Sequence, residues 1–254
     1  MKEKQVLLAH GDGGRLTRNL IEELFLRAFE NPQLRLLGDS ALLELDNSRI
    51  AFTTDSYTVK PIFFPGSDIG RLAGFGTVND LSVMGARPLY LSCGFILEEG
   101  LEMADLERIV NSMKESAQRV GVKLVTGDTK VVERGGADKV FINTSGIGEL
   151  LDWETMGKAP SEGDEILISG SIGEHGIAIL SARGELELKM PVESDCAPIW
   201  ELVELLYKNQ VPVKWMRDPT RGGVATALNE LVQDSNFGIE VFEDKIPLKP
   251  AVDS

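Results

Sequence analysis

The order of the apolar segments limits what this chain can fold into more than any other feature of its sequence. Apolar residues recur at helical spacing in three segments, at residues 15–29, 69–84 and 106–120. Strand-like apolar runs lie between and after these segments, at residues 41–45, 50–54, 89–97, 122–126 and 139–147. Strands and helices do not alternate strictly, as they do in a parallel α/β sheet. We therefore predict an α+β fold.

A polar connection that contains Gly and Pro, residues 153–163, divides the chain. We predict one domain at residues 1–152 and a second at residues 153–254. In the second domain the apolar pattern predicts two strands and three helices, at residues 165–169, 238–242, 176–182, 196–208 and 224–232. The sequence ends at Ser254 in a polar stretch that contains Pro, so we expect this domain to be incomplete.

Charge and composition exclude several classes of function. The chain has 26 Lys and Arg against 40 Asp and Glu, a net charge of −14, which would repel a nucleic acid. It contains no apolar run of about 18 residues that could cross a membrane, and no apolar segment long enough for a secretory signal. The two cysteines, Cys93 and Cys196, form neither a disulfide framework nor a zinc site, and we expect both to be structural. These features favour a cytoplasmic protein.

Four short segments place an acidic or amide side chain beside glycine or at the end of a strand. They are Gly38-Asp39-Ser40, Thr53-Thr54-Asp55-Ser56, Asn79-Asp80 and Thr126-Gly127-Asp128-Thr129-Lys130. Carboxylates that converge at one end of a sheet suit Mg²⁺, which takes hard oxygen ligands and bridges to phosphates. For any one of these Asp residues, the alternative is a turn or capping role.

Two glycine clusters are candidates for binding phosphate. Gly11, Gly13 and Gly14 precede the first predicted helix, and Gly222-Gly223 opens a later one. Glycine lets the backbone approach an anion closely, and the start of a helix favours negative charge. Neither cluster matches the P-loop pattern, so a flexible connection is the alternative. The preceding Arg217-Asp218-Pro219-Thr220-Arg221 run could meet phosphate or serve only as a helix cap.

Three of these segments together resemble the AIR-synthetase-like ATP-binding superfamily. Residues 78–88 resemble its Asn-Asp helix, residues 126–130 its Gly-Asp-Thr motif, and residues 218–223 its Asp-Pro-Thr-Arg-Gly-Gly turn. The order and separation of the motifs match along nearly the whole chain. The resemblance implies a PurM-like N-terminal domain, a β-rich sheet with helices, followed by a truncated PurM-like C-terminal α+β domain.

Within this superfamily the chain is most similar to the HypE family of hydrogenase maturation factors. The similarity lies in the His10-Gly11-x-Gly13-Gly14 loop, in residues 126–132 and 169–176, and in Met216-Arg217. Selenophosphate synthetases carry a reactive Cys or selenocysteine in the N-terminal loop, and this loop has none. HypE-like proteins use ATP to dehydrate an S-carbamoyl group on their own C-terminal cysteine. The thiocyanate that forms is the source of the cyanide ligands of NiFe hydrogenase.

The resemblance also implies roles for particular residues. Lys130 and Asp80 are expected to be catalytic, with Lys130 meeting the transferring phosphate or the carbamoyl oxygen. Mg²⁺ is expected to be held by four carboxylates, Asp39, Asp55, Asp80 and Asp128. ATP is expected to contact Gly11, Gly13, Gly14, Asn79, Thr126, Gly127, Thr129, Asp218, Arg221, Gly222 and Gly223.

The expected partners are a second copy of the chain, the carbamoyltransferase HypF and the HypC–HypD complex. The homodimer is expected to form through the N-terminal domains, with ATP held near the interface. One departure matters: the family ends in Pro-Arg-x-Cys, which this sequence lacks, so we expect a truncated chain that binds ATP without modifying itself. The alternatives are another ATP-using enzyme, of the purine-pathway ligase or thiamine-phosphate kinase type, and a non-catalytic nucleotide-binding scaffold.

Overall fold

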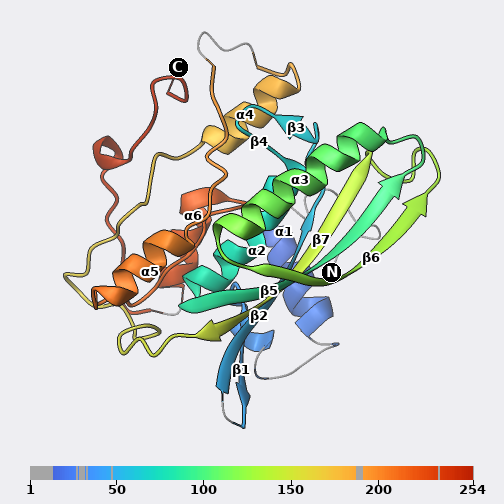
Figure 1. Cartoon of the computed structure of the whole chain (residues 1–254). Helices are drawn as coiled ribbons and strands as arrows, with labels where there is room; N and C mark the ends of the chain where they lie inside the picture. Colours follow the sequence, from blue (N-terminus) through green and yellow to red (C-terminus); the bar gives the residue numbers. More distant parts are fainter. Residues whose placement is uncertain are drawn as a thin grey trace.

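The computed structural model describes residues 14–26, 28, 32, 34–46, 48–186, 191–233 and 235–253 (Figure 1). His10, Gly11 and Gly13 lie outside the described residues. Among the described residues, none of the helices is both long and apolar enough to cross a membrane.

A five-stranded sheet forms the centre of the first domain. Its order is β1 (Ala41–Leu45), β2 (Ser48–Tyr57), β7 (Val140–Leu150), β5 (Ala86–Glu98) and β6 (Lys123–Val132). Neighbouring strands are antiparallel except β5 and β6, which are parallel. All five strands predicted in the first domain are therefore confirmed, and four of them are longer than their apolar runs.

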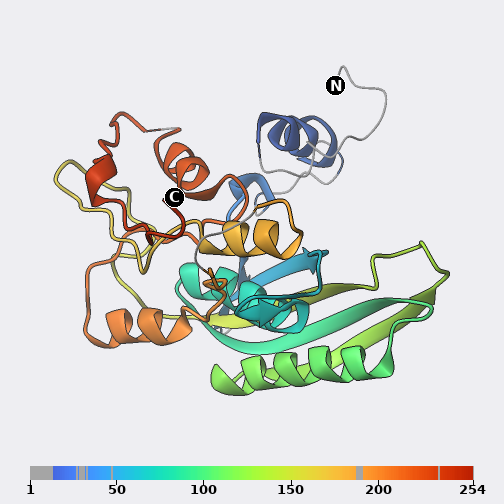
Figure 2. The same ribbon diagram turned by 90° about the horizontal axis from the view of Figure 1, so that it is seen from above.

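Alternation of side chains along each strand gives the sheet two different faces. In β7, Ile142 and Thr144 are buried, whereas Asn143 and Ile147, which point to the other face of the sheet, are exposed. Helices α2 (Ile69–Val83) and α3 (Met103–Arg119) cover the buried face, and Figure 2 shows α3 running along the strands. The opposite face, called the open face below, carries the exposed apolar side chains of Phe52, Tyr90, Ile96 and Ile147.

Close contact between α2 and α3 depends on small residues. A Cβ atom on Gly70 would overlap the backbone oxygen of Ile109, and one on Gly74 would lie 2.7 Å from Cβ of Ser116. Asp68 begins α2 as its N-cap, because its carboxylate accepts hydrogen bonds from the backbone N–H groups of residues 70 and 71. The chain enters α2 through a short hairpin, β3 (Phe63–Phe64) and β4 (Ser67–Asp68), which the apolar pattern did not predict.

The second half of the chain consists of helices joined by long connecting segments (Figure 1). They are α4 (Glu174–Ala182), α5 (Trp200–Lys208), α6 (Gly223–Val232) and the 3₁₀ turn η4 (Glu243–Lys245). Helix α5 joins the two halves, because Trp200 and Val203 are buried with Phe75 and Val78 of α2.

The strands predicted at residues 165–169 and 238–242 are wrong. No described residue after Leu150 belongs to a strand, and Leu167 is 84% exposed. A strand requires a neighbour that accepts and donates its backbone hydrogen bonds, and no other described strand lies beside either run. The helices predicted here exist, although α5 begins at Trp200 rather than at residue 196.

At the N-terminal end, the single helix predicted for residues 15–29 is two shorter elements. The α-helix α1 (Arg15–Leu20) continues directly as a π-helical turn, η2 (Ile21–Leu26). A 3₁₀ turn, η3 (Leu34–Leu36), follows before the sheet begins.

Replacing Gly70 with Ala tests how much the fold depends on the contact between α2 and α3. We expect Gly70→Ala to lower the free energy of unfolding by about 1–3 kcal/mol, because the added methyl group meets backbone rather than a movable side chain. Gly176→Ala in α4 is the matched control, since no atom lies within 4 Å of its added Cβ. It should be neutral or stabilising by up to about 1 kcal/mol. Urea denaturation followed by circular dichroism measures both, and equal midpoints would contradict the packing argument.

Candidate functional site

Four carboxylates gather where the two halves of the chain meet. Asp39 precedes β1, Asp55 lies in β2, Asp80 lies in α2, and Asp218 precedes α6. We call these four residues the acid cluster. Asp218, Asp55 and Asp39 lie close enough to Asp80 for each of them to raise the pKa of Asp80. The first three were predicted as metal ligands, and Asp218 as a cofactor contact.

Hydrogen bonds from β2 fix two members of the cluster. The Thr53 hydroxyl lies 2.8 Å from the backbone oxygen of Asp39 and 2.9 Å from Oδ2 of Asp80, and it can donate to either. The Ser40 hydroxyl donates to the backbone oxygen of Asp80 at 3.2 Å. Thr53 is buried, so these bonds are sheltered from water. Thr53 was not among the predicted site residues, although it stands two positions before Asp55 and so faces the same side of the strand.

Burial and mutual repulsion make the cluster retain protons. Burial, followed by repulsion from Asp218 and Asp55, raises the pKa of Asp80 to about 9. Burial, followed by repulsion from Asp39, raises the pKa of Asp218 to about 7. The pKa of Asp39 is also raised by burial, although the nearby Arg217 guanidinium opposes the shift.

Arg217 supplies positive charge directly to the acid cluster. Its guanidinium forms ion pairs with Asp39 at 2.8 Å and with Glu230 at 2.5 Å. The side chains of Arg217 and Asp39 are only 20% and 13% exposed, so this pair is better shielded than an ordinary surface salt bridge. The sequence singled out Arg217 as a possible carboxylate or phosphate contact, without assigning it a site.

The acid cluster has the chemistry of a cation site. Oδ2 of Asp39 is buried without a hydrogen-bond partner, and burial raises the pKa values of the neighbouring carboxyls of Asp80 and Asp218 well above their ordinary range. A divalent cation would satisfy that oxygen and offset the repulsion between the carboxylates. Within the described part of the chain, however, no three Asp, Glu, His or Cys side chains are arranged around one metal-sized point. The acid cluster therefore suits a divalent cation by its charge and its oxygen donors, and not by a preformed arrangement of ligands.

Asp128, the fourth predicted metal ligand, does not join the cluster within one chain. The strand register aligns Asp55 with Thr144, Cys93 and Gly127, so Asp128 falls in the next row and faces the open side of the sheet. Three strand spacings, roughly 14 Å, separate these two rows along the sheet. The nearest charge to Asp128 is Lys130, whose Nζ lies 3.1 Å away. Both side chains are well exposed.

The other residues of the 126–130 motif divide between the same two faces. Thr126 is paired with Ser92 and points to the open face, whereas Thr129 is paired with Phe95 and points the other way. Gly127 has a structural role, because a Cβ atom there would overlap the backbone oxygen of Cys93.

Glycine shapes the turn that carries Asp218. Gly222 and Gly223 have φ angles of +78° and +59°, a left-handed conformation that other residues rarely adopt, and Gly222 is the N-cap of α6. Arg221, just before them, is exposed. Gly14 is the exposed N-cap of α1, and it is the member of the predicted N-terminal glycine loop that the structure describes.

Asn79 does not face the acid cluster. Its Nδ2 donates to the backbone oxygen of Ala197 at 3.0 Å, and its Oδ1 accepts from the backbone N–H of Ile199 at 3.0 Å. The Asn79 amide therefore binds a segment of the second domain, and its contact with a cofactor stays a prediction.

The two cysteines and the described histidine have structural surroundings. Cys93 lies in the core and burial raises its pKa to about 12, while burial also raises the pKa of the half-buried Cys196. The ring of His175 makes a 2.9 Å hydrogen bond with the Ser194 hydroxyl through Nδ1 and packs edge-on against Phe64.

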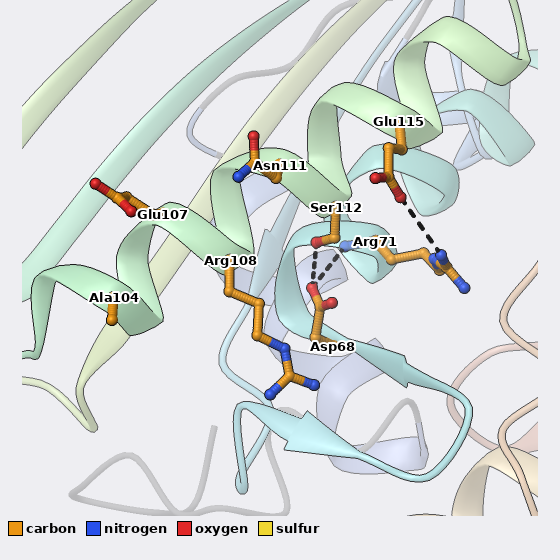
Figure 3. Close-up of a pocket in the computed structure, with 8 residues that line it drawn as sticks. All are labelled: Asp68, Arg71, Ala104, Glu107, Arg108, Asn111, Ser112 and Glu115. Carbon is orange, nitrogen blue, oxygen red and sulfur yellow. Dashed lines mark hydrogen bonds and ion pairs between the residues drawn. The ribbon is translucent and has the colours of Figure 1, made fainter.

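A polar pocket of about 490 Å³ lies between α2 and α3, remote from the acid cluster (Figure 3). Asp68, in its wall, accepts hydrogen bonds that cap α2 and another from Ser112. Asp68 and Asp80 stand at opposite ends of α2, roughly 18 Å apart along its axis. Positive and negative side chains alternate around the pocket, including Arg71 and Glu115, so it has no clear preference for an anion or a cation.

Comparison with known families covers both halves of the chain. Residues 37–150 match the AIR synthase related protein, N-terminal domain, and residues 161–253 match the AIR synthase related protein, C-terminal domain. The chain thus has the two domains of an AIR synthase related protein. The boundary at residues 153–163 stays a prediction.

Individual relatives show to which family of AIR synthase related proteins the chain belongs. The carbamoyl dehydratase HypE of Escherichia coli K12 is 47% identical, with 97% of this chain and 75% of the relative covered. The HypE subunit of a HypE–HypF crystal structure is 51% identical with a TM-score of 0.86, covering 92% of this chain and 76% of that one. HypE crystallised with ATP is 54% identical with a TM-score of 0.77, covering 98% and 74%. This chain belongs to the HypE family.

The raised pKa of Asp80 predicts how stability depends on pH. In the unfolded chain Asp80 has its ordinary pKa of 3.8, and in the folded chain about 9. Between these values the folded chain holds a proton that the unfolded chain releases, so this group's contribution to stability falls as pH rises. We expect Asp80→Asn to raise Tm by more than about 2 °C at pH 8 and to change it little at pH 4.

Thermal unfolding of both proteins in a buffer with chelator measures this difference. Asp128→Asn is the matched control, because Lys130 and the Thr129 backbone lower the pKa of Asp128 instead of raising it. It should give no gain in Tm at pH 8. An Asp80→Asn protein whose Tm difference is independent of pH would contradict the predicted protonation of Asp80.

Proposed function

We propose that this chain uses ATP and Mg²⁺ to dehydrate an S-carbamoyl cysteine to a thiocyanate, which supplies the cyanide ligands of NiFe hydrogenase. The observation that carries the proposal is the acid cluster, a site suited to a cation and phosphates, in a chain 47% identical to proteins named carbamoyl dehydratase. A HypE relative has also been crystallised with ATP.

The chemistry requires the amide oxygen to become a leaving group. Transfer of the γ-phosphoryl group to the carbamoyl oxygen gives an S-bound imidate phosphate and ADP. Breaking the C–O bond then releases phosphate, and with loss of the remaining N–H proton the carbon and nitrogen form the nitrile of the thiocyanate. The balanced reaction is S-carbamoyl cysteine plus ATP to S-cyano cysteine, ADP and phosphate.

The acid cluster would hold the cation through Asp39, Asp55, Asp80 and Asp218. A bound Mg²⁺ neutralises charge on the nucleotide phosphates during transfer. Arg217 orients Asp39 through their ion pair and opposes the rise in its pKa, and the start of α6 at Gly222 offers backbone N–H groups to a phosphate. Asp80 and Asp218 would release protons when a cation binds, because burial and the neighbouring carboxylates raise their pKa values.

We propose a homodimer in which the open faces of two sheets meet. Phe52, Ile147 and Tyr90 are directly paired across three strands and expose a continuous apolar row on this face. Lys130 and Asp128 lie on the same face, separated from their own chain's acid cluster by the sheet. In the dimer, Lys130 of one chain would serve the acid cluster of the other and stabilise the transferring phosphate or the carbamoyl oxygen.

The proposed carbamoyl donor is HypF, since a HypE relative forms a complex with HypF and its fold matches this chain closely. The HypC–HypD complex is the proposed acceptor of the cyanide. The carbamoylated thiol belongs to a tail of the Pro-Arg-x-Cys type. Cys93 cannot serve because it is buried in the core, and Cys196 is held half-buried beside α2, with a raised pKa.

A peptide that ends in Pro-Arg-Ala-Cys and carries an S-carbamoyl group tests the reaction directly. Supplied at millimolar concentration, it replaces the local concentration that a tethered tail would have. With ATP and Mg²⁺, we expect mass spectrometry to show the loss of one water from the peptide, together with equimolar phosphate. Asp80→Asn should slow this by at least about 100-fold, whereas Glu107→Gln, in the pocket of Figure 3, should not.

Two results would contradict the proposal. Phosphate release that needs a different small metabolite and leaves the peptide unchanged would indicate another ATP-using enzyme. ATP binding without turnover of any substrate would indicate a nucleotide-binding scaffold.

Mixing two inactive variants tests whether the site is shared between subunits. Asp80→Asn and Lys130→Ala should each be inactive alone. When they are co-expressed in equal amounts, half of the dimers are mixed, and each mixed dimer has one centre with both native residues. We expect about one quarter of the native peptide-dehydration rate. If the two residues acted within one chain, mixing would restore nothing.

A further inference from the structure

The side chain of Asn79 links the two halves of the chain at two points. Its amide nitrogen donates to the oxygen of Ala197 and its amide oxygen accepts from the N–H of Ile199, both at 3.0 Å. The two bonds reproduce the pairing of one strand residue with a neighbouring backbone. They hold residues 197–199 of the second domain against the C-terminal half of α2.

Asn79 and Asp80 are consecutive, and they point in different directions. Successive residues of an α-helix are separated by about 100° around its axis. Asp80 therefore faces Thr53 and the acid cluster, while Asn79 faces the second domain. Any shift of α2 relative to residues 197–199 moves Asp80 as well.

The bonds to Asn79 lie at the start of α5. Ile199 is the N-cap of α5 and makes no side-chain capping bond of its own, so the Asn79 oxygen satisfies one of the free N–H groups at this end. Directly after it, Trp200 is buried against α2. Asn79 thereby fixes both the position and the first residue of the helix that joins the halves.

The acid cluster needs that junction, because Asp218 comes from the second half of the chain. The ion pair between Arg217 and Asp39 is a second link across the same junction. Together, the Asn79 hydrogen bonds and the Arg217–Asp39 ion pair hold Asp218 close enough to Asp80 to raise the pKa of Asp80.

We propose that Asn79 is a positioning residue, whose amide fixes residues 197–199 on α2 and so holds Asp218 beside Asp80. The part of this inference that concerns nucleotide binding rests on the proposed function of the acid cluster as the Mg²⁺–ATP site. The contact between Asn79 and residues 197–199 does not depend on that function. A positioning role also differs from a direct role of Asn79 in binding the cofactor.

Asn79→Asp separates the two roles with the smallest change. The variant keeps an oxygen for the Ile199 N–H but places a second oxygen, in place of the N–H₂ donor, against the oxygen of Ala197. If Asn79 contacts the cation, an added carboxylate should leave binding of Mg²⁺–ATP unchanged or strengthen it. If Asn79 positions the second domain, the variant should weaken that binding by about 10–100-fold, and Asn79→Ala should weaken it too.

Hydrogen exchange measured by mass spectrometry tests the contact between Asn79 and residues 197–199 in the absence of ATP. We expect both variants to speed exchange in a peptide covering residues 196–206 by at least about 10-fold, with peptides from β2 and β7 unchanged. Unchanged exchange near Ile199 would overturn the proposal whether or not the protein binds ATP. Faster exchange together with unchanged or tighter Mg²⁺–ATP binding would overturn its second half. Failure of the native chain to bind ATP would instead count against the proposed function.

Arg217→Ala supplies a further check. Two links that hold the same junction should not act independently, so the loss of Mg²⁺–ATP affinity in the Asn79→Ala, Arg217→Ala double variant should differ from the product of the single losses. Independent, multiplicative losses would argue that Asn79 acts on the ligand directly.

Discussion

Repulsion among half-buried carboxylates is the constraint that the rest of the structure must accommodate. Asp39, Asp55, Asp80 and Asp218 stand close together with Arg217 as the basic side chain paired within the cluster. A chain does not gather such groups without cost, since each half-buried carboxylate loses part of its hydration. Protonation meets this cost in part, since the pKa values of Asp80 and Asp218 are raised. The packing around α2 holds the carboxylates together against the remaining repulsion, and under the proposed function this repulsion would favour binding of a cation.

Helix α2 is the element on which these demands converge. Its glycines admit α3 on one side, and on another side Thr77 forms a buried hydroxyl chain with Tyr57 and Thr144 of the sheet. Its C-terminal half presents Asn79 to the second domain and Asp80 to the acid cluster. Because both neighbours of α2 are close-packed, α2 cannot move to relieve the carboxylates. The same rigidity makes the position of Asp80 depend on the docking of α5.

The sequence predicted the strands of the first domain better than those of the second. Alternation of apolar and polar residues can be seen within one segment, whereas the pairing of strands depends on residues far apart in the chain. Runs such as residues 139–147 carry their own period and identify strands directly. Residues 165–169 carry a similar apolar run, yet no described strand accepts their hydrogen bonds.

At the site, the position of Asp39, Asp55 and Asp80 beside strands and glycines was enough to suggest a common centre. Asp128 was grouped with them on the same pattern, but the face it occupies depends on register, and β5 and β6 shift register between Leu91 and Ser92. The sequence likewise could not show that Thr53 faces Asp80 or that Arg217 pairs with Asp39, contacts made by residues far apart in the chain.

The placement of the predicted groups on two faces of one sheet has a consequence for the family's chemistry. Under the proposed function, the acid cluster and Lys130 must lie within a few ångströms of one substrate. Within one chain the sheet itself separates Lys130 from Asp80. The apolar row of Phe52, Ile147 and Tyr90 lies on the same face as Lys130, so the face proposed for the dimer also carries the proposed catalytic lysine. Association and completion of the site would then be a single event, and an isolated chain could hold a nucleotide without transferring its phosphate.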